Sequence, residues 1–352
     1  MRYLFPLIAS CQLAATASAQ TVPADLLDMS LEQLVQTTVT SGSGSEAVSR
    51  WSFRYSTTVS DYKDYFVGND KTSYDAVLWS PGQEARTSAN YPVMPTEIIQ
   101  LVHALSLTYR HDEHWSATFL LPYIEQSSDH ISIVPGYDDF TIDSDGLGDI
   151  GILPAYSWTS GAGSRWQASL GMTLPTGSID KEGDTPRGPG EQQLPYTMQI
   201  GSGTYDVVAA LSAEARRNSL SFGGRVSAKV RLGENDRNYT LGNSYSATAW
   251  TGYEGWQHAR PSLGVTYWWR GRVNGEDEEL SFPGAPFPYP APVVDPQRFG
   301  GEQVELAARL ELPLGASGVA LEAEYRIPLW RDLNGPQSGL NYSYRIGLQY
   351  DL

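Results

Sequence analysis

The chain has 352 residues, 41% of them apolar, and a formal net charge of -16 at pH 7. A chain this acidic is unsuited to binding nucleic acid, whose phosphates require a basic surface. After residue 19 no stretch approaches the ~18 to 20 consecutive apolar residues of a membrane-spanning helix, which excludes a helical membrane protein. The 34 Gly, 21 Tyr and 10 Trp suit a β-barrel, which uses them at turns and at the membrane interfaces.

Residues 1–19 have the pattern of a secretory signal peptide. A positive start is followed by a mostly apolar stretch and by Ala-Ser-Ala at 17–19, a small-residue cleavage site. Cleavage there removes Cys11, the only cysteine, and with it any disulfide or cysteine-ligated metal. The alternative is a lipoprotein-type cleavage at residues 8–11 with acylation of Cys11, which leaves a signal of only ten residues.

Residues 20–47 are predicted to form a short periplasmic amphipathic helix and a Gly/Ser linker. The apolar positions that share one helical face are Leu27, Leu31, Leu34 and Val35. The segment 29–41, Met-Ser-Leu-Glu-Gln-Leu-Val-Gln-Thr-Thr-Val-Thr-Ser, resembles the mature start of many TonB-dependent receptors. Those receptors carry a plug domain and 22 strands, whereas here the first predicted strand begins almost immediately, so receptor function does not carry over. The helix is expected to plug the barrel, to dock on its rim, or to bind a periplasmic protein.

Residues 48–352 are predicted to form an all-β, antiparallel, up-and-down transmembrane barrel of about 12 strands. Each predicted strand is close to the ~9 to 11 tilted residues that cross a bilayer. The segments with alternating polarity are 50–60, 97–109, 115–123, 148–158, 166–174, 204–213, 219–232, 244–254, 261–272, 303–312, 319–329 and 340–352.

The connections between these segments alternate between long and short. In chain order they are 61–96, 110–114, 124–147, 159–165, 175–203, 214–218, 233–243, 255–260, 273–302, 313–318 and 330–339. Short periplasmic turns that alternate with longer outer loops are typical of bacterial outer-membrane barrels. The pattern therefore predicts an outer-membrane protein, in contact with outer-membrane lipid and with both termini in the periplasm.

The last strand shows the clearest alternation. Its apolar positions are Leu340, Tyr342, Tyr344, Ile346, Leu348, Tyr350 and Leu352. The intervening polar residues are expected to face inward, as are the charged residues of other strands, because a charge facing lipid at the midplane costs roughly 2 to 4 kcal/mol. The predicted lumen-lining residues are Arg54, Arg225, Lys229, Glu305, Arg309, Glu322, Glu324, Arg326 and Arg345. They form either a structural ladder of ion pairs or the lining of a polar path.

Two further segments leave alternatives open. His103 shares a face with Leu101, Leu105 and Leu107, so the orientation of that strand is undecided. The aromatic, proline-rich stretch 282–296 cannot pair as a strand. It is either a loop folded over the mouth, in contact with apolar ligands, or a plain surface loop.

No motif predicts a cofactor or an enzyme. Residues 146–151 match G-x-G-x-x-G but lead into a strand, not a helix. Asp143, Asp145 and Asp149 have the spacing of a calcium loop without its later ligands, which makes them a weak calcium candidate. His111 and His114 lie in a short turn without a third ligand, and no G-x-S-x-G elbow occurs.

Three segments carry a family resemblance: 145–150 (Asp-Gly-Leu-Gly-Asp-Ile), 174–178 (Leu-Pro-Thr-Gly-Ser) and 194–206 (Leu-Pro-Tyr-Thr-Met-Gln-Ile-Gly-Ser-Gly-Thr-Tyr-Asp). They resemble the outer-membrane barrel family of transporters assigned to the meta-cleavage pathway of phenol degradation, over roughly residues 100–352. The resemblance implies passage of small aromatic or apolar molecules. Asp149 and Asp206 are expected to cap backbone groups where outer loops enter strands.

The leading hypothesis is a passive channel or transporter for small molecules, including aromatic or hydrophobic ones. A closed barrel that anchors a periplasmic complex through residues 23–45 is the alternative. An outer-membrane hydrolase is the third.

Overall fold

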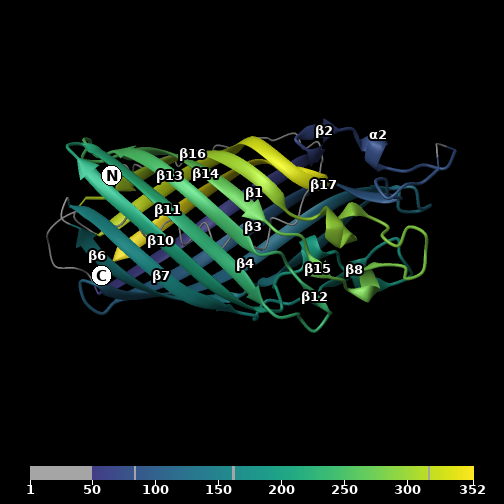
Figure 1. Ribbon diagram of the computed structural model, residues 1–352, viewed down its shortest axis with the longest axis horizontal. Coiled ribbons are helices and arrows are strands. Elements are labelled where there is room, and N and C mark those ends of the chain that lie inside the picture. The colour runs from purple at the N-terminus through teal and green to yellow at the C-terminus, as the bar shows by residue number, and fades with distance from the viewer. Residues whose placement is uncertain (1–49, 83–84, 161–162, 316–317) are drawn as a thin grey trace, which may run out of the picture.

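The computed structural model describes residues 50–82, 85–160, 163–315 and 318–352, which form a single antiparallel β-barrel (Figure 1). The predicted signal peptide, amphipathic helix and linker lie outside the described residues. Within them, eleven strands close the barrel because the last strand pairs with the first. In chain order they are β1 (Trp51–Gly68), β3 (Val93–Arg110), β4 (Trp115–Ser132), β6 (Ile150–Ser160), β7 (Ser164–Leu174), β10 (Tyr205–Arg217), β11 (Leu220–Leu232), β13 (Ser244–Tyr253), β14 (Arg260–Arg270), β16 (Gly301–Pro313) and β17 (Val319–Asp351).

The closed antiparallel barrel is confirmed, but among the described residues the strands that close it number eleven and not twelve. The two last predicted strands and the connection 330–339 between them all belong to β17, a 33-residue element. Its first arm runs antiparallel to β16 and its second antiparallel to β1, and Leu333 pairs with both neighbours. The Asp351 N–H donates to the Gly318 carbonyl over 2.9 Å, so both arms end at the same rim.

Strands β1, β3 and β4 have 18 residues each and extend well past their predicted ends. The predicted loop 124–147 is mostly strand, since it contains the end of β4 and β5 (Asp139–Leu147), which pairs with it. In the second half of β4, side chains still alternate between the two faces. There, however, Gln126 and Ser128 face inward while Glu125 faces outward. Both faces are polar there, so the polarity contrast that marks a membrane strand disappears.

The connections confirm the predicted alternation of long and short. The short turns and Leu352 lie at one rim, here called the turn end (Figure 1). The long connections gather at the opposite rim, the loop end. They carry β2 (Asp70–Thr72), α2 (Tyr74–Val77), β8 (Glu182–Asp184), β9 (Glu191–Gln193), η1 (Tyr196–Met198), β12 (Tyr239–Thr240), β15 (Asn274–Gly275), η2 (Glu278–Leu280), η3 (Pro292–Val294) and η4 (Pro296–Arg298). No helix among the described residues is long and apolar enough to cross a membrane.

The outer surface is apolar and the inner surface polar, as the face assignment predicts. In β17 the side chains of Tyr344 and Ile346 are exposed, whereas that of Arg345 between them is buried. At the turn end, outward aromatic rings pair across neighbouring strands, with the centroids of Trp51 and Tyr109 4.7 Å apart and those of Trp115 and Tyr156 5.0 Å apart. Such a girdle is typical of a membrane interface.

The prediction that Leu340 shares the outer apolar face is wrong, because its side chain is only 1% exposed. The register shifts at this point, since Asp61 pairs with Tyr342 but the next residue, Tyr62, pairs with Leu340. The unpaired Asn341 is a β-bulge. One extra residue shifts the alternation, so residues before and after the bulge no longer follow the same inward and outward pattern. Leu340 therefore faces the interior.

The structure also decides the orientation of His103, which lies on the outer face. Its Nδ1 is 2.7 Å from the Tyr55 hydroxyl, and its Nε2 is 3.4 Å from a carboxylate oxygen of Glu125.

Candidate functional site

The predicted inward charges of β1, β16 and β17 form one network of buried ion pairs. Glu322 lies 3.3 Å from Arg54 on one side and 2.9 Å from Arg309 on the other. Glu324, two residues further along β17, lies 2.5 Å from Arg326 and 2.9 Å from Arg345.

Glu305 completes this network, with a carboxylate oxygen 3.5 Å from Arg326. The structure thus brings together seven of the nine predicted lumen residues on one wall. Each charge has an opposite partner, as burial in a region of low dielectric requires.

The other two, Arg225 and Lys229, lie on β11, on another part of the wall. Lys229 belongs there to a second buried charge cluster. Lys229 is 3.4 Å from Asp206 of β10, and the neighbouring Arg231 also binds that carboxylate. Asp206 further accepts hydrogen bonds from the hydroxyls of Thr173 (2.8 Å) and Thr204 (2.7 Å). Among the described residues Asp206 binds side chains, and not the backbone groups that the sequence predicted for it.

Asp206 was therefore missed as a partner of the inward cations. The pairing could have been predicted from the hairpin of β10 and β11, because its register places Asp206 directly opposite Arg231.

A small cavity of about 60 Å³ separates the two walls inside the barrel. Arg225 faces it from β11, and Arg309, Glu324 and Arg345 face it from the other wall. Thr248, Thr266 and Trp250 also line it, on the strands between. The interior therefore offers a narrow space bordered by fixed charges of both signs.

The three segments that carry the family resemblance meet at one point near the loop end, here called the glycine junction. The Asp149 carboxylate accepts hydrogen bonds from the Gly177 N–H (3.0 Å), the Ser202 N–H (2.9 Å) and the Ser202 hydroxyl (2.6 Å). The predicted capping role of Asp149 matches this geometry. A Cβ on Gly201 would lie 2.2 Å from the Gly177 carbonyl oxygen, so the two backbones approach as only glycine permits.

The loop that starts at this junction crosses the mouth of the barrel. It connects β7 with β10, which lie across the closed sheet from β1 and β17. Yet its residues Leu194 and Met198, both fully buried, pack in one apolar cluster with Tyr62 of β1 and Leu340 of β17. The segment 194–200 therefore spans the interior at the loop end.

Two further loops pack on this segment and form with it the cap, defined as residues 175–204, 233–243 and 271–300. The Tyr196 ring lies 4.7 Å from that of Tyr239 and 5.6 Å from that of Phe299, measured between centroids. The Asp277 N–H donates to the Tyr196 hydroxyl oxygen over 2.9 Å. Each of the three loops thus contributes to one buried apolar cluster.

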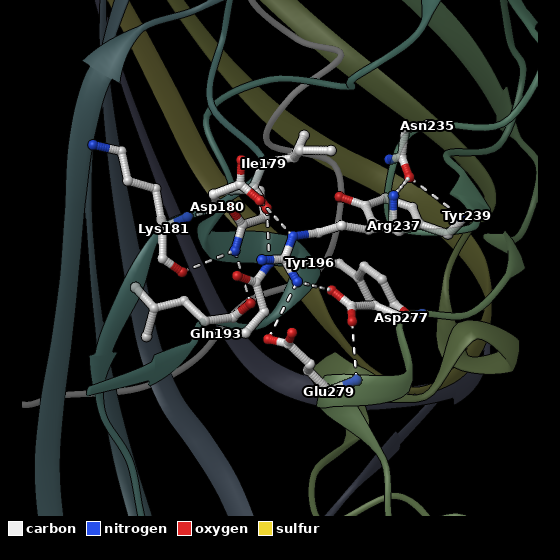
Figure 2. A network of polar contacts seen from close by, with 12 residues as sticks. Ile179, Asp180, Lys181, Gln193, Tyr196, Asn235, Arg237, Tyr239, Asp277 and Glu279 are labelled. Atoms are coloured by element: carbon white, nitrogen blue, oxygen red, sulfur yellow. Dashed lines mark hydrogen bonds and ion pairs between the residues drawn. The ribbon is translucent and has the colours of Figure 1, made fainter. Parts of the chain in front are cut away.

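Arg237 links the three loops of the cap by charge (Figure 2). Its Nε donates to Asp180 over 2.6 Å, and its Nη1 lies 3.1 Å from Asp277 and 3.3 Å from Glu279. Burial acts to lower the pKa of Arg237, but the three carboxylates outweigh it and hold this pKa above its ordinary value. No feature of the sequence singled out this residue.

The proline-rich stretch 282–296 belongs to the cap. Of the two alternatives that the sequence left open, its second half fits the loop folded over the mouth and not the plain surface loop. Val293 and Val294 are buried in the same cluster as Tyr196. The Pro290 carbonyl accepts a hydrogen bond from the Val93 N–H over 3.1 Å, which ties the stretch to the start of β3. A plain surface loop would leave these residues exposed.

The weak calcium candidates do not form a common ligand set. Asp143 and Asp145 point outward from β5, where Asp145 accepts a hydrogen bond from Tyr123, whereas Asp149 is buried in the glycine junction. In the turn at 111–114, His114 Nδ1 instead contacts the Ser157 carbonyl. The described part of the chain contains no group of three His, Cys, Asp or Glu side chains that could hold a metal ion.

Comparison with known proteins agrees with this architecture. Residues 87–282 match the family model described as "Putative MetA-pathway of phenol degradation". Among solved structures, an outer membrane channel from Pseudomonas putida F1 has a TM-score of 0.57 at 12% identity, over 87% of this chain and 96% of that one. The translocator domain of the autotransporter NalP from Neisseria meningitidis has a TM-score of 0.44 at 10% identity, over 92% and 95%. No curated protein matches the sequence.

Proposed function

Because the chain belongs to the MetA-pathway phenol degradation family, and its barrel encloses a charged interior, we propose that it is a passive outer-membrane channel for small molecules. The turn end, with its short connections and Leu352, faces the periplasm, and the loop end faces the outside. Both termini are then periplasmic.

The observation that carries this proposal is the pair of charged walls with a space between them. Arg225, Glu324 and Arg345 border this space from both walls. Fixed charges of both signs suit small solutes that carry polar or charged groups. The family description favours aromatic compounds among these solutes.

The cap is the second element of the proposed path. The segment 194–200 and the cluster around Tyr196 lie across the mouth, so solutes pass when the cap moves or where it leaves a gap at its edge. The channel is therefore expected to conduct in discrete events of low conductance, not as a wide porin.

Planar-bilayer recording of the purified, refolded chain tests this function. Wild-type protein is expected to show discrete conductance steps, and liposomes that contain it are expected to swell in arabinose but not in raffinose. A variant with a weakened cap, Arg237→Gln, serves as the second sample because it removes the contacts that hold the cap loops together. If neither protein conducts or permits swelling, the barrel is sealed and the channel is rejected.

A further inference from the structure

A cleft at the loop end lies apart from the charged interior. Its volume is about 370 Å³, and it lies between residues 86–91 of the β1–β3 connection and residues 286–298 of the cap. It is larger than the interior cavity and falls within the range of ~300 to 1,000 Å³ that is usual for small-molecule sites. The side chains that give it its character are Arg86, Arg272, Arg298, Phe287, Tyr289 and Tyr91.

Two of these arginines have no carboxylate partner among the described contacts. Arg86 donates from Nη2 to the Tyr289 carbonyl (2.6 Å), while its Nε is buried without any hydrogen-bond partner. Burial lowers the pKa of Arg86 from its ordinary value. Arg272 reaches only neutral amide oxygens, 3.2 Å away on Gln297 and 3.5 Å away on Asn334.

The third arginine is neutralised within the cleft. Arg298 lies 3.2 Å from the Asp295 carboxylate and donates to the Tyr91 hydroxyl oxygen over 2.9 Å. Among the described residues of the lining, Asp295 is the one acidic side chain. These residues therefore carry an excess of two positive charges in a protein whose net charge is -16, which marks the cleft as a site for an anion.

The apolar part of the lining indicates the shape of that anion. The Arg86 guanidinium lies 5.2 Å from the centroid of the Phe287 ring, and prolines flank this ring on both sides in the sequence. A planar ring in the cleft can stack on these surfaces while its acidic group meets the guanidinium forks, which match a carboxylate in a bidentate fashion. The volume limits the ligand to a small molecule and leaves no room for lipid acyl chains.

We propose that this cleft binds small aromatic carboxylates on the outer side of the barrel, before any passage through it. The inference adds a capture site and a ligand charge to the proposed channel. It does not depend on conductance, since a sealed barrel with this cleft would still bind such a ligand.

The test is isothermal titration of the full mature chain in detergent with sodium benzoate. Benzyl alcohol carries the same ring without the charge, and sodium acetate and inorganic phosphate supply charge without the ring. Benzoate is expected to bind at least tenfold more tightly than each of the three.

Variants assign the binding to the cleft. Arg272→Gln and Arg86→Gln are each expected to weaken benzoate binding about tenfold, because each removes a charge-assisted contact, and Phe287→Ala should also weaken it. The matched control is Arg217→Gln, an exposed arginine at the turn end, which should bind as wild type does. Heat-modifiable gel mobility checks that every variant is folded.

Three results would overturn the proposal: benzyl alcohol binding as tightly as benzoate, phosphate binding as tightly as benzoate, or both arginine variants retaining wild-type affinity. Bilayer recording of the same samples separates this outcome from that of the channel. Benzoate binding without conductance rejects the channel alone, and conductance without selective benzoate binding rejects the cleft alone.

Discussion

Replacement of Arg237 by glutamine tests whether charge contacts hold the cap closed. The contact that matters most is with Asp277, whose side chain is only 4% exposed, whereas Asp180 and Glu279 are 68% and 63% exposed. A hydrogen bond to a buried charged group contributes about 1.5 to 3 kcal/mol. Exposed ion pairs contribute much less, because water screens them.

We therefore expect Arg237→Gln to favour the open cap by about 3 kcal/mol, which corresponds to roughly a 100-fold change in the open population. Cleavage of the cap loops by dilute protease is expected to accelerate by a similar factor, because it follows the open population when the cap recloses quickly. The open time in bilayer recordings should rise in parallel. The melting temperature of the barrel should stay near that of wild type, since the strand ladder is unchanged.

The matched control is Arg216→Gln at the turn end. Arg216 also makes two ion pairs, 3.1 Å from Glu214 and 3.2 Å from Glu254, but it is remote from the cap. The reasoning is refuted if Arg237→Gln leaves cap cleavage and open time within twofold of wild type. It is equally refuted if Arg216→Gln changes both as strongly.

Three other predictions follow from the same geometry. Gly201→Ala should lower the unfolding free energy by about 1 to 3 kcal/mol, because the added Cβ overpacks the glycine junction. Gly224→Ala is the control and should not lower it, since its Cβ would have no atom closer than 3.6 Å. Equal denaturant midpoints for the two variants would contradict this prediction. Glu324→Gln should shift the ion selectivity of the channel toward anions, because Arg326 and Arg345 lose a shared partner. The reversal potential in a KCl gradient measures this selectivity, and Glu113→Gln in an exposed turn is the control. Burial raises the pKa of the cap tyrosines Tyr196 and Tyr239 above the ordinary value of 10. The stability that they contribute is therefore complete below pH 10 and decreases above it as the unfolded chain ionises. Protease sensitivity of the cap should increase above pH 10, and a flat profile up to pH 11 would oppose this.

The sequence predicts well those parts of the barrel where lipid and lumen impose opposite polarity on alternate residues. Arg345 and its neighbours in β17 illustrate this, since each inward polar residue lies between two outward apolar ones. The same rule fails at Leu340, because a bulge reverses the alternation without changing the residue types. It also fails in the second half of β4, where both faces are polar and no contrast remains.

The cap could be predicted only in part, because its contacts join residues that are distant in the sequence. Tyr196 and Asp277 are separated by 81 positions, and Arg237 and Asp180 by 57. Periodicity carries no information about such pairs. The proline content of 282–296 correctly predicts a loop, but the packing of Val293 under the cap depends on Tyr196 and Phe299, which belong to other segments.

The charged interior and the cap are stabilised by different contacts, and this difference indicates that the cap controls the opening of the path. The charged wall on β16 and β17 belongs to strands joined by a backbone ladder along their length, so its residues cannot separate without opening the barrel. The cap is held by side-chain packing and by Arg237, and its loops have no ladder with the barrel wall among the described pairings. Opening the cap therefore requires far less free energy than widening the interior. The cleft is formed in part by cap residues 286–298 in the closed structure, so a solute bound there stabilises the closed cap. Benzoate added on the loop side is then expected to shorten the open time, and benzyl alcohol is not.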